Sequence, residues 1–108
     1  MSMLSLVMTA LKPTGVPVGY MTATAANTYI TFFFVNERGS LFVDDDEIGT
    51  DYLLQVDIWS KGDYTALYDQ VKSLLKGVGF IRTHAQDLYE TDTKIYHKAI
   101  TFSYTKRS

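Results

Sequence analysis

The feature that most constrains the fold is a change in the spacing of apolar residues between positions 51 and 80. At first every second residue is apolar, which is the alternation of a half-buried strand: Tyr52, Leu54, Val56 and Ile58. Further on, apolar residues recur every three or four positions, which is the stripe of an amphipathic helix: Tyr64, Leu67, Tyr68, Val71, Leu74 and Leu75. The sequence therefore predicts a strand followed directly by a helix.

Both ends of this helix carry boundary signals. Asp63 can cap the N-terminus through its side chain, and Ser60 followed by Asp63 three residues later is an alternative capping arrangement. At the other end, Gly77 or Gly79 can adopt the left-handed conformation that stops a helix. We therefore expect a helix over residues 63–77.

Three more segments have the composition of strands. Residues 28–35, TYITFFFV, are rich in β-branched and aromatic side chains. Residues 80–89 and 94–104 read as a hairpin connected by residues 90–93. The run 28–35 is apolar on both faces, so a helix must cover one face, and a second helix or another subunit must cover the other. Residues 36–39, Asn-Glu-Arg-Gly, have the composition of a turn.

The N-terminal segment predicts a short helix over residues 2–12, with an apolar stripe formed by Leu4, Val7, Met8 and Leu11. Pro17 restricts the segment after this helix to a sheet edge or to a position outside the sheet. The expected fold class is α+β: a mostly antiparallel sheet of about four strands, packed against one main helix, plus the short N-terminal helix. One domain spanning residues 1–108 accounts for this length.

An acidic segment interrupts the pattern between residues 39 and 51. It has no clear period, and we expect a mobile loop that carries Asp44, Asp45, Asp46 and Glu47. A calcium loop starting at its first acid would place Ile48 at the fifth ligand position and Gln55 at the twelfth, where a glutamate is needed. A solvated loop, a subunit contact and a weak cation site remain as alternatives.

The sequence offers no constellation for catalysis. It has no cysteine, and no serine lies in a Gly-x-Ser-x-Gly motif. His84 and His97 could share a site if their strands pair, but a metal would need a third ligand such as Asp87 or Glu90. We therefore expect no enzyme activity, no cofactor and no metal.

The distribution of charge argues against several partners. The formal net charge is −2, which does not favour sequence-specific binding to nucleic acid. Residues 1–51 carry two basic and six acidic residues, net −4, and residues 52–108 carry eight basic and six acidic residues, net +2. Such polarity favours contact between identical subunits. No apolar run approaches the ~20 residues that span a bilayer, so we expect no membrane association.

Aromatic residues add a candidate for an interface. The chain has eight Tyr, six Phe and one Trp, and Tyr and Trp are common anchors of protein interfaces. Trp59 lies at the end of a strand on its less apolar face, so it is a candidate interface residue. Packing beneath the turn at residues 60–63 is an equally good interpretation.

Three segments carry a resemblance to a known family. VDIWSKGDYT, the helix that ends in GVGF, and DLYETDTKIYHKAITF are similar to the small tail-completion, or head-to-tail joining, proteins of long-tailed bacteriophages and prophages. The resemblance covers roughly the last sixty residues well and the first fifty loosely, and it is a long pattern without a catalytic fingerprint.

This resemblance implies a non-enzymatic virion structural protein. The chain would assemble into a homo-oligomeric ring that completes the tail and joins it to the head, with tail-tube and head-connector proteins as partners. It would be made and assembled in the host cytoplasm and reside in the tail or neck of the virion. In this interpretation the acids of residues 44–47 and Trp59 are interface candidates. The alternative function is a small α+β binding module for a peptide or an apolar ligand.

Overall fold

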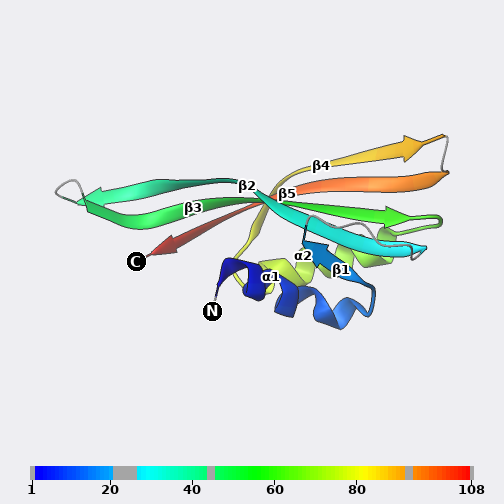
Figure 1. Ribbon diagram of the computed structural model, residues 1–108, viewed down its shortest axis with the longest axis horizontal. Helices are drawn as coiled ribbons and strands as arrows, with labels where there is room; N and C mark the ends of the chain where they lie inside the picture. The colour runs from blue at the N-terminus through cyan, green and yellow to red at the C-terminus, as the bar shows by residue number, and fades with distance from the viewer. Residues whose placement is uncertain (1, 21–26, 44–45, 92–93, 108) are drawn as a thin grey trace.

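The structure, a computed structural model, describes residues 2–20, 27–43, 46–91 and 94–107. Two α-helices, one 3-10 turn and five strands follow one another along these residues (Figure 1). Their bounds are α1 Met3–Leu11, η1 Lys12–Thr14, β1 Val18–Tyr20, β2 Thr28–Val43, β3 Asp46–Ser60, α2 Thr65–Gly77, β4 Ile81–Glu90 and β5 Ile95–Arg107.

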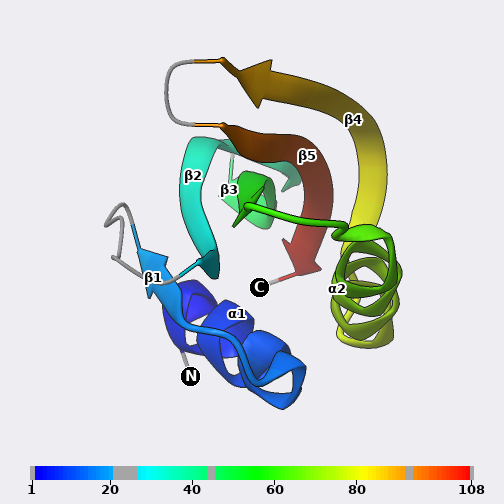
Figure 2. The same ribbon diagram turned by 90° about the vertical axis from the view of Figure 1, so that its right-hand side faces the viewer.

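The strands form one sheet in the order β1-β2-β3-β5-β4. All neighbours are antiparallel except β1 and β2, which are parallel. Figure 2 shows that both helices lie on the same side of this curled sheet. The predicted α+β class and the mostly antiparallel sheet are therefore confirmed. The sheet has one strand more than expected because β1, which begins directly after Pro17, adds an edge strand.

The core lies between the sheet and the two helices. The alternation predicted in β3 is present, since Leu54, Val56 and Ile58 are fully buried. In β2, Ile30 pairs with Ile58 and Phe32 pairs with Val56, so apolar side chains from adjacent strands share the covered face. Further fully buried members of this core are Val7, Leu11, Val71, Leu75, Ile100 and Phe102. Burial of this apolar area is the main term that stabilises the fold.

Helix α2 ends at Gly77 as expected, but it begins at Thr65 instead of residue 63, and Tyr64, not Asp63, is its N-cap residue. The Asp63 carboxylate accepts hydrogen bonds from the Thr65 backbone N–H at 2.9 Å and from its hydroxyl at 2.7 Å. At the other end Gly79 has a φ of +106°, and a Cβ there would lie 2.6 Å from Cε2 of Tyr104. Gly79 therefore meets two demands at once, a left-handed backbone and a close approach to an aromatic ring.

The inward face of each helix differs in detail from the predicted stripe. In α1, Val7 and Leu11 are buried as expected, but Leu4 and Met8 are exposed. Met3, Leu6 and Ala10 pack against the core in their place. In α2, Val71 and Leu75 are buried, whereas Leu74 is half-buried. The stripe on α1 is rotated because the helix docks beside β1 and α2 instead of lying centred on the sheet.

The expected turn at residues 36–39 and the expected loop at residues 39–51 are both wrong for the described positions. Residues 36–43 continue β2, and residues 46–51 begin β3. The two strands pair from Thr28 and Ser60 out to Val43 and Asp46. The period of two is hidden in the sequence because the register shifts three times, between residues 34 and 36, 39 and 41, and 41 and 42.

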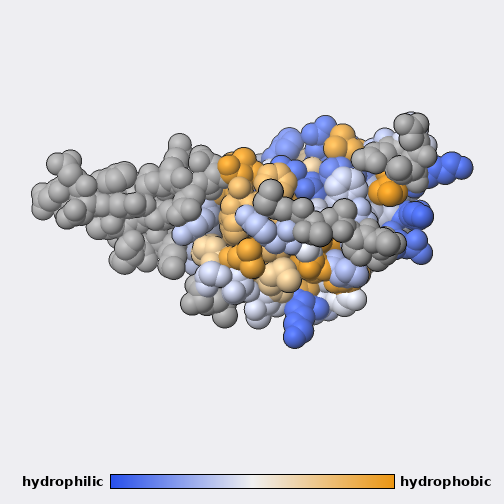
Figure 3. Space-filling view, in the orientation of Figure 1, coloured by the Kyte–Doolittle hydropathy of each residue, from blue (hydrophilic) through white to orange (hydrophobic). Residues whose placement is uncertain are grey.

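The resulting molecule is elongated, with principal extents of 53 × 25 × 22 Å. The distal parts of β2 and β3, residues 36–43 and 46–51, project from the helix-covered part (Figure 1). We call this projection the arm and the remainder the body. Apolar residues reach the surface of the body among charged ones (Figure 3). Among the described residues, no helix has the length and apolarity needed to cross a membrane.

Candidate functional site

The described residues contain no arrangement suited to metal binding, since no three His, Cys, Asp or Glu side chains among them come together. The two histidines do not face each other, although their strands pair as expected. In the β4–β5 ladder His84 lies opposite Thr101, and His97 lies opposite Leu88. The structure therefore does not bring His84 and His97 into a shared site.

Trp59 lies on the sheet face that neither helix covers. Its ring stacks on His97, with ring centroids 3.8 Å apart, and on Tyr29 at 5.9 Å. The indole N–H donates a hydrogen bond to the Thr31 hydroxyl at 3.0 Å. The three rings come from β2, β3 and β5, so this ladder joins the three central strands where no helix lies. Trp59 is thus held by its neighbours across the sheet, and its role at an interface remains a prediction.

Beside this ladder lies a carboxylate that sequence reasoning did not single out. Asp57 is 5% exposed, and one of its oxygens lies 2.7 Å from Nε2 of His97. The Gln55 amide donates to both carboxylate oxygens, at 3.0 and 3.2 Å. A buried carboxylate is costly unless it is hydrogen-bonded or paired, and here both conditions are met when the imidazole is protonated. The contact joins β3 to β5 across the sheet.

A second polar cluster lies where β4, β5 and the start of α2 meet. The Tyr64 hydroxyl donates a hydrogen bond to Asp87, and the Lys98 ammonium lies 3.0 Å from the same oxygen. The Lys98 ammonium also sits over the Tyr68 ring, 4.2 Å from its centroid. Lys98 interrupts an otherwise apolar face of β5. This interruption is the sequence feature from which the cluster could have been predicted.

The cluster shifts two pKa values in opposite directions. Burial, together with the hydrogen bond to Asp87, raises the pKa of Tyr64 to about 12. Hydrogen bonds from Tyr64 and Lys98 lower the pKa of Asp87. At neutral pH the phenol therefore stays protonated and the carboxylate stays charged, which suits a fixed contact and not proton transfer.

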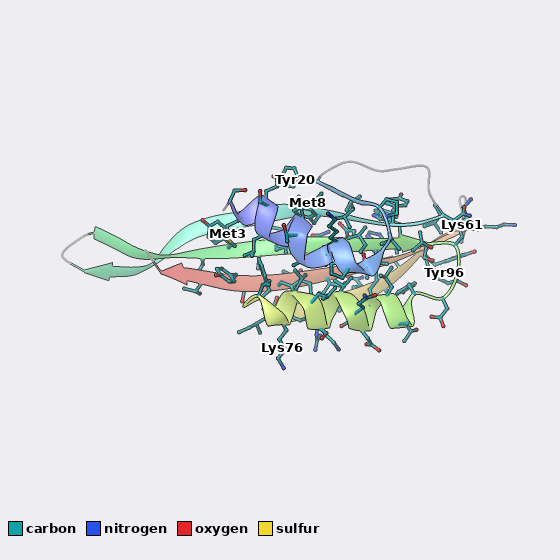
Figure 4. All side chains as sticks on the ribbon, turned by 90° about the horizontal axis from the view of Figure 1, so that it is seen from below. Met3, Met8, Tyr20, Lys61, Lys76 and Tyr96 are labelled. Atoms are coloured by element: carbon teal, nitrogen blue, oxygen red, sulfur yellow. The ribbon has the colours of Figure 1, made fainter. Side chains whose placement is uncertain are left out.

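An open depression of about 690 Å³ lies at this end of the body. Figure 4 shows Lys61 and Tyr96 there, beyond the start of α2. Its lining residues are Lys61, Gly62, Asp63, Tyr64, Thr65, Tyr68, Asp69, Asp87, Tyr96 and Lys98. Acids and bases of both signs share the lining with tyrosines, so the depression selects no single ligand charge.

Two of the four acidic candidates, Asp46 and Glu47, lie in the arm. Asp44 and Asp45 fall outside the described residues. Asp46 and Glu47 begin β3, where they pair with Val43 and Phe42 of β2. Asp46 and Glu47 therefore lie at the distal end of the arm, away from the helix-covered body. An interface role for these four residues remains a prediction.

Comparison with known proteins identifies a shared fold. No protein-family model matches the chain, and no curated protein matches it. Among solved structures, the chain is similar to a chain from the virion of a native gene transfer agent (GTA) particle, with a TM-score of 0.67. The superposition covers 99% of this chain and 96% of that chain at 12% sequence identity. At this identity the similarity establishes the fold over the full length of both chains.

Proposed function

We propose that this chain is a non-enzymatic structural protein of a tailed phage or phage-like virion. It completes the tail and joins it to the head by forming a ring of identical subunits. The observation that carries this proposal is the arm, which extends the sheet beyond its helical cover (Figure 1). The full-length similarity in fold to a chain of a gene transfer agent virion supports a place in such a particle.

The arm is better placed to contact a partner than to stabilise the fold of its own subunit. The outward stretch of β2, residues 36–43, spans about 25 Å at the usual rise of a strand. Neither helix contacts this part of the sheet in the views of Figures 1 and 4. From Gly49 towards the tip, β5 no longer pairs with β3, and among the described strands only β2 and β3 remain. An isolated two-stranded hairpin is marginally stable in water, so a partner that covers this end of the arm would stabilise it.

The chemistry of the body agrees with a structural role. Its buried carboxylate, Asp57, is held by hydrogen bonds with the half-buried side chains of His97 and Gln55. The Tyr64–Asp87–Lys98 cluster fixes the start of α2 against the β4–β5 hairpin. Both arrangements hold strands and helix together, which gives each subunit a rigid body from which the arm projects.

A ring places heterologous contacts between its subunits, with one surface of each copy against a different surface of the next. The arm on one side and the body on the other are two such different surfaces. The uneven charge supports this arrangement, since residues 1–51 are net negative and the sequence after residue 51 is net positive. Opposite charges at a contact speed association and fix its register.

The experiment that tests the proposal is particle purification from the host that carries the gene. We expect the chain to copurify with tails in a fixed ratio of several copies per tail, measured by quantitative mass spectrometry. Deletion of the gene should leave filled heads and tails that do not join. Particles that are complete without the gene, or that contain no copies of the chain, would contradict a virion role. A peptide-binding module would be absent from purified particles.

A further inference from the structure

The outer edge of β4 is an unusually open strand edge. In the sheet order β1-β2-β3-β5-β4, this strand of ten residues is the last, so no described strand pairs with its outer side. Edge strands are commonly protected by proline, by charged side chains, above all lysine, or by bulges. β4 contains no proline or lysine, although it carries Arg82, Asp87 and Glu90, and its register shift lies near its start. From His84 to Glu90 the ladder with β5 is regular, so the outer edge of this stretch is continuous.

Most side chains of β4 are exposed to solvent. Every residue from 81 to 89 is exposed except Ala85, which is half-buried. Three of them are large and apolar: Ile81 is 67%, Leu88 41% and Tyr89 49% exposed. Apolar exposure along an unpaired edge is the combination that marks a site of strand addition.

The second open edge belongs to β2 on the opposite side of the sheet. β1 pairs with β2 only at Ile30, Thr31 and Phe32. From residue 33 to residue 43, no strand of the described chain pairs with that side of β2. Val35, at the base of this stretch, is 49% exposed. This free edge is about as long as β4.

We propose that β4 of one subunit pairs with the free edge of β2, residues 33–43, of a second copy of this chain. This inference deepens the proposed function, because it names the contact that would build the ring, and it rests on that function for the number of copies. Both edges offer backbone N–H and C=O groups in similar number. β4 carries three large exposed apolar side chains, and Val35 is exposed on β2. Main-chain hydrogen bonds would supply affinity, and the apolar side chains would exclude water from the new ladder.

The position of the two edges sets the symmetry. Because they lie on opposite sides of one sheet, pairing leaves each added copy with one edge still free. Repetition then produces a head-to-tail series that closes into a ring when the rotation per copy permits. A pairing of β4 with β4 would instead give an isologous dimer and stop. The long free stretch of β2 leads out along the arm, so the same contact would also cover the arm.

The absence of cysteine makes this contact directly testable. We would introduce the pair Val35→Cys and Gln86→Cys, one on each edge, and treat the assembled protein with a short bismaleimide. Within one subunit, three strand spacings of about 4.8 Å separate these strands, with a further offset along them, so a short reagent cannot join the two positions internally. The matched control is Val35→Cys with Ser73→Cys, which moves the second thiol to the exposed surface of α2.

We expect a ladder of covalent oligomers from V35C/Q86C that ends at one ring size, and no ladder from V35C/S73C or from either single variant. In the same samples, hydrogen exchange should slow at β4 amides on assembly. Equal ladders from V35C/Q86C and V35C/S73C would overturn the inference, because cross-linking would then result from crowding of subunits and not from a specific contact. Slowed exchange at β4 without a ladder would also overturn it, because another protein would then occupy the edge.

The failure of this contact is distinguishable from the failure of the proposed function. Chain that copurifies with tails in several copies but gives no V35C/Q86C ladder would refute the edge pairing and leave the virion role intact. Purified chain at high concentration that gives the specific ladder would support the edge pairing even if particles are complete without the gene. If neither purified chain nor particles give the ladder, edge pairing between copies is wrong.

Discussion

The same two strands meet very different surroundings in the body and in the arm. In the body, β2 and β3 lie under α1 and α2, and Ile30, Phe32 and Leu54 are fully buried there. In the arm, the strands continue their ladder past residues 36 and 51 without helical cover. Pairing of the backbone is common to both regions, so the difference lies in what covers the sheet.

This difference separates the residues that fold the subunit from those that remain for contact with a partner. Backbone hydrogen bonds contribute modestly to net stability because water offers the unfolded chain similar bonds. Apolar burial contributes more, and in the body it lies between the sheet and the two helices. We therefore expect substitutions in the body to change stability and substitutions in the arm to change assembly.

The largest expected effect is loss of core packing in the body. Leu75 is fully buried on α2, so Leu75→Ala should lower the free energy of unfolding by about 2–5 kcal/mol. Urea denaturation monitored by circular dichroism measures this change. Leu74→Ala is the matched control, since its half-buried side chain should cost clearly less. Equal losses from the two variants would show that α2 docks in a different rotation.

The polar network on the open face should give the next largest effect. His97→Ala removes a partner of buried Asp57 and one ring of the aromatic ladder, and should cost about 1–3 kcal/mol. Thermal or urea unfolding measures the loss. His84→Ala changes the other, exposed histidine and should stay within about 0.5 kcal/mol of the parent. If His97→Ala were equally mild, the open face would contribute little to the body.

A smaller effect should appear at alkaline pH. The pKa of Tyr64 is raised to about 12 in the folded chain from 10.0, so the folded state retains a proton that the unfolded state releases. This contribution is fully present below pH 10 and is lost as the pH rises towards 12. Tyr64→Phe should therefore weaken the decline in stability between pH 10 and 12, measured by urea unfolding at each pH. Parallel curves for parent and variant would refute the contact with Asp87.

The smallest effect on stability should come from the tip of the arm. Replacement of Asp44, Asp45, Asp46 and Glu47 by Ser should change the free energy of unfolding by no more than about 0.5 kcal/mol. The same variant should join heads to tails less efficiently, because it loses charge at the proposed contact. Salt screens such contacts, so the difference from the parent should shrink as ionic strength rises. Normal joining at low salt would show that these acids are solvated and contribute nothing to an interface.

Most of the body was predictable because its longer elements carry local patterns, whereas the three-residue strand β1 was not expected. Alternation at Leu54, Val56 and Ile58 and the stripe ending at Leu75 both match their buried positions. The end of α2 was predictable because a glycine, Gly79, follows its last turn and adopts a positive φ there. In β3 and α2 these apolar side chains are the ones that form the core, so the sequence itself records the orientation.

The arm and the polar contacts were not predictable for two physical reasons. Register shifts near Asn36 and Gly39 interrupt the period of two, so a long strand resembles a turn and a loop. The partner of Asp57 is His97, forty positions away in sequence, and only the pairing of β3 with β5 brings them together. Long-range register is absent from local patterns. Lys98 stands out in the sequence as a charged residue on an apolar face of β5. Its partner Asp87 could not be identified, because only the pairing of β4 with β5 brings the two together.

Residue-resolved amide hydrogen exchange tests the division between body and arm most directly. Beyond residue 49 towards the tip, β3 loses β5 as a neighbour and only the β2–β3 pair remains. We predict slow exchange for residues 28–35 and 52–60 of the free subunit, fast exchange for residues 39–43 and 46–48, and slower exchange of the latter in assembled tails. Uniform slow exchange along the whole of β2 and β3 in the free subunit, unchanged on assembly, would contradict the account.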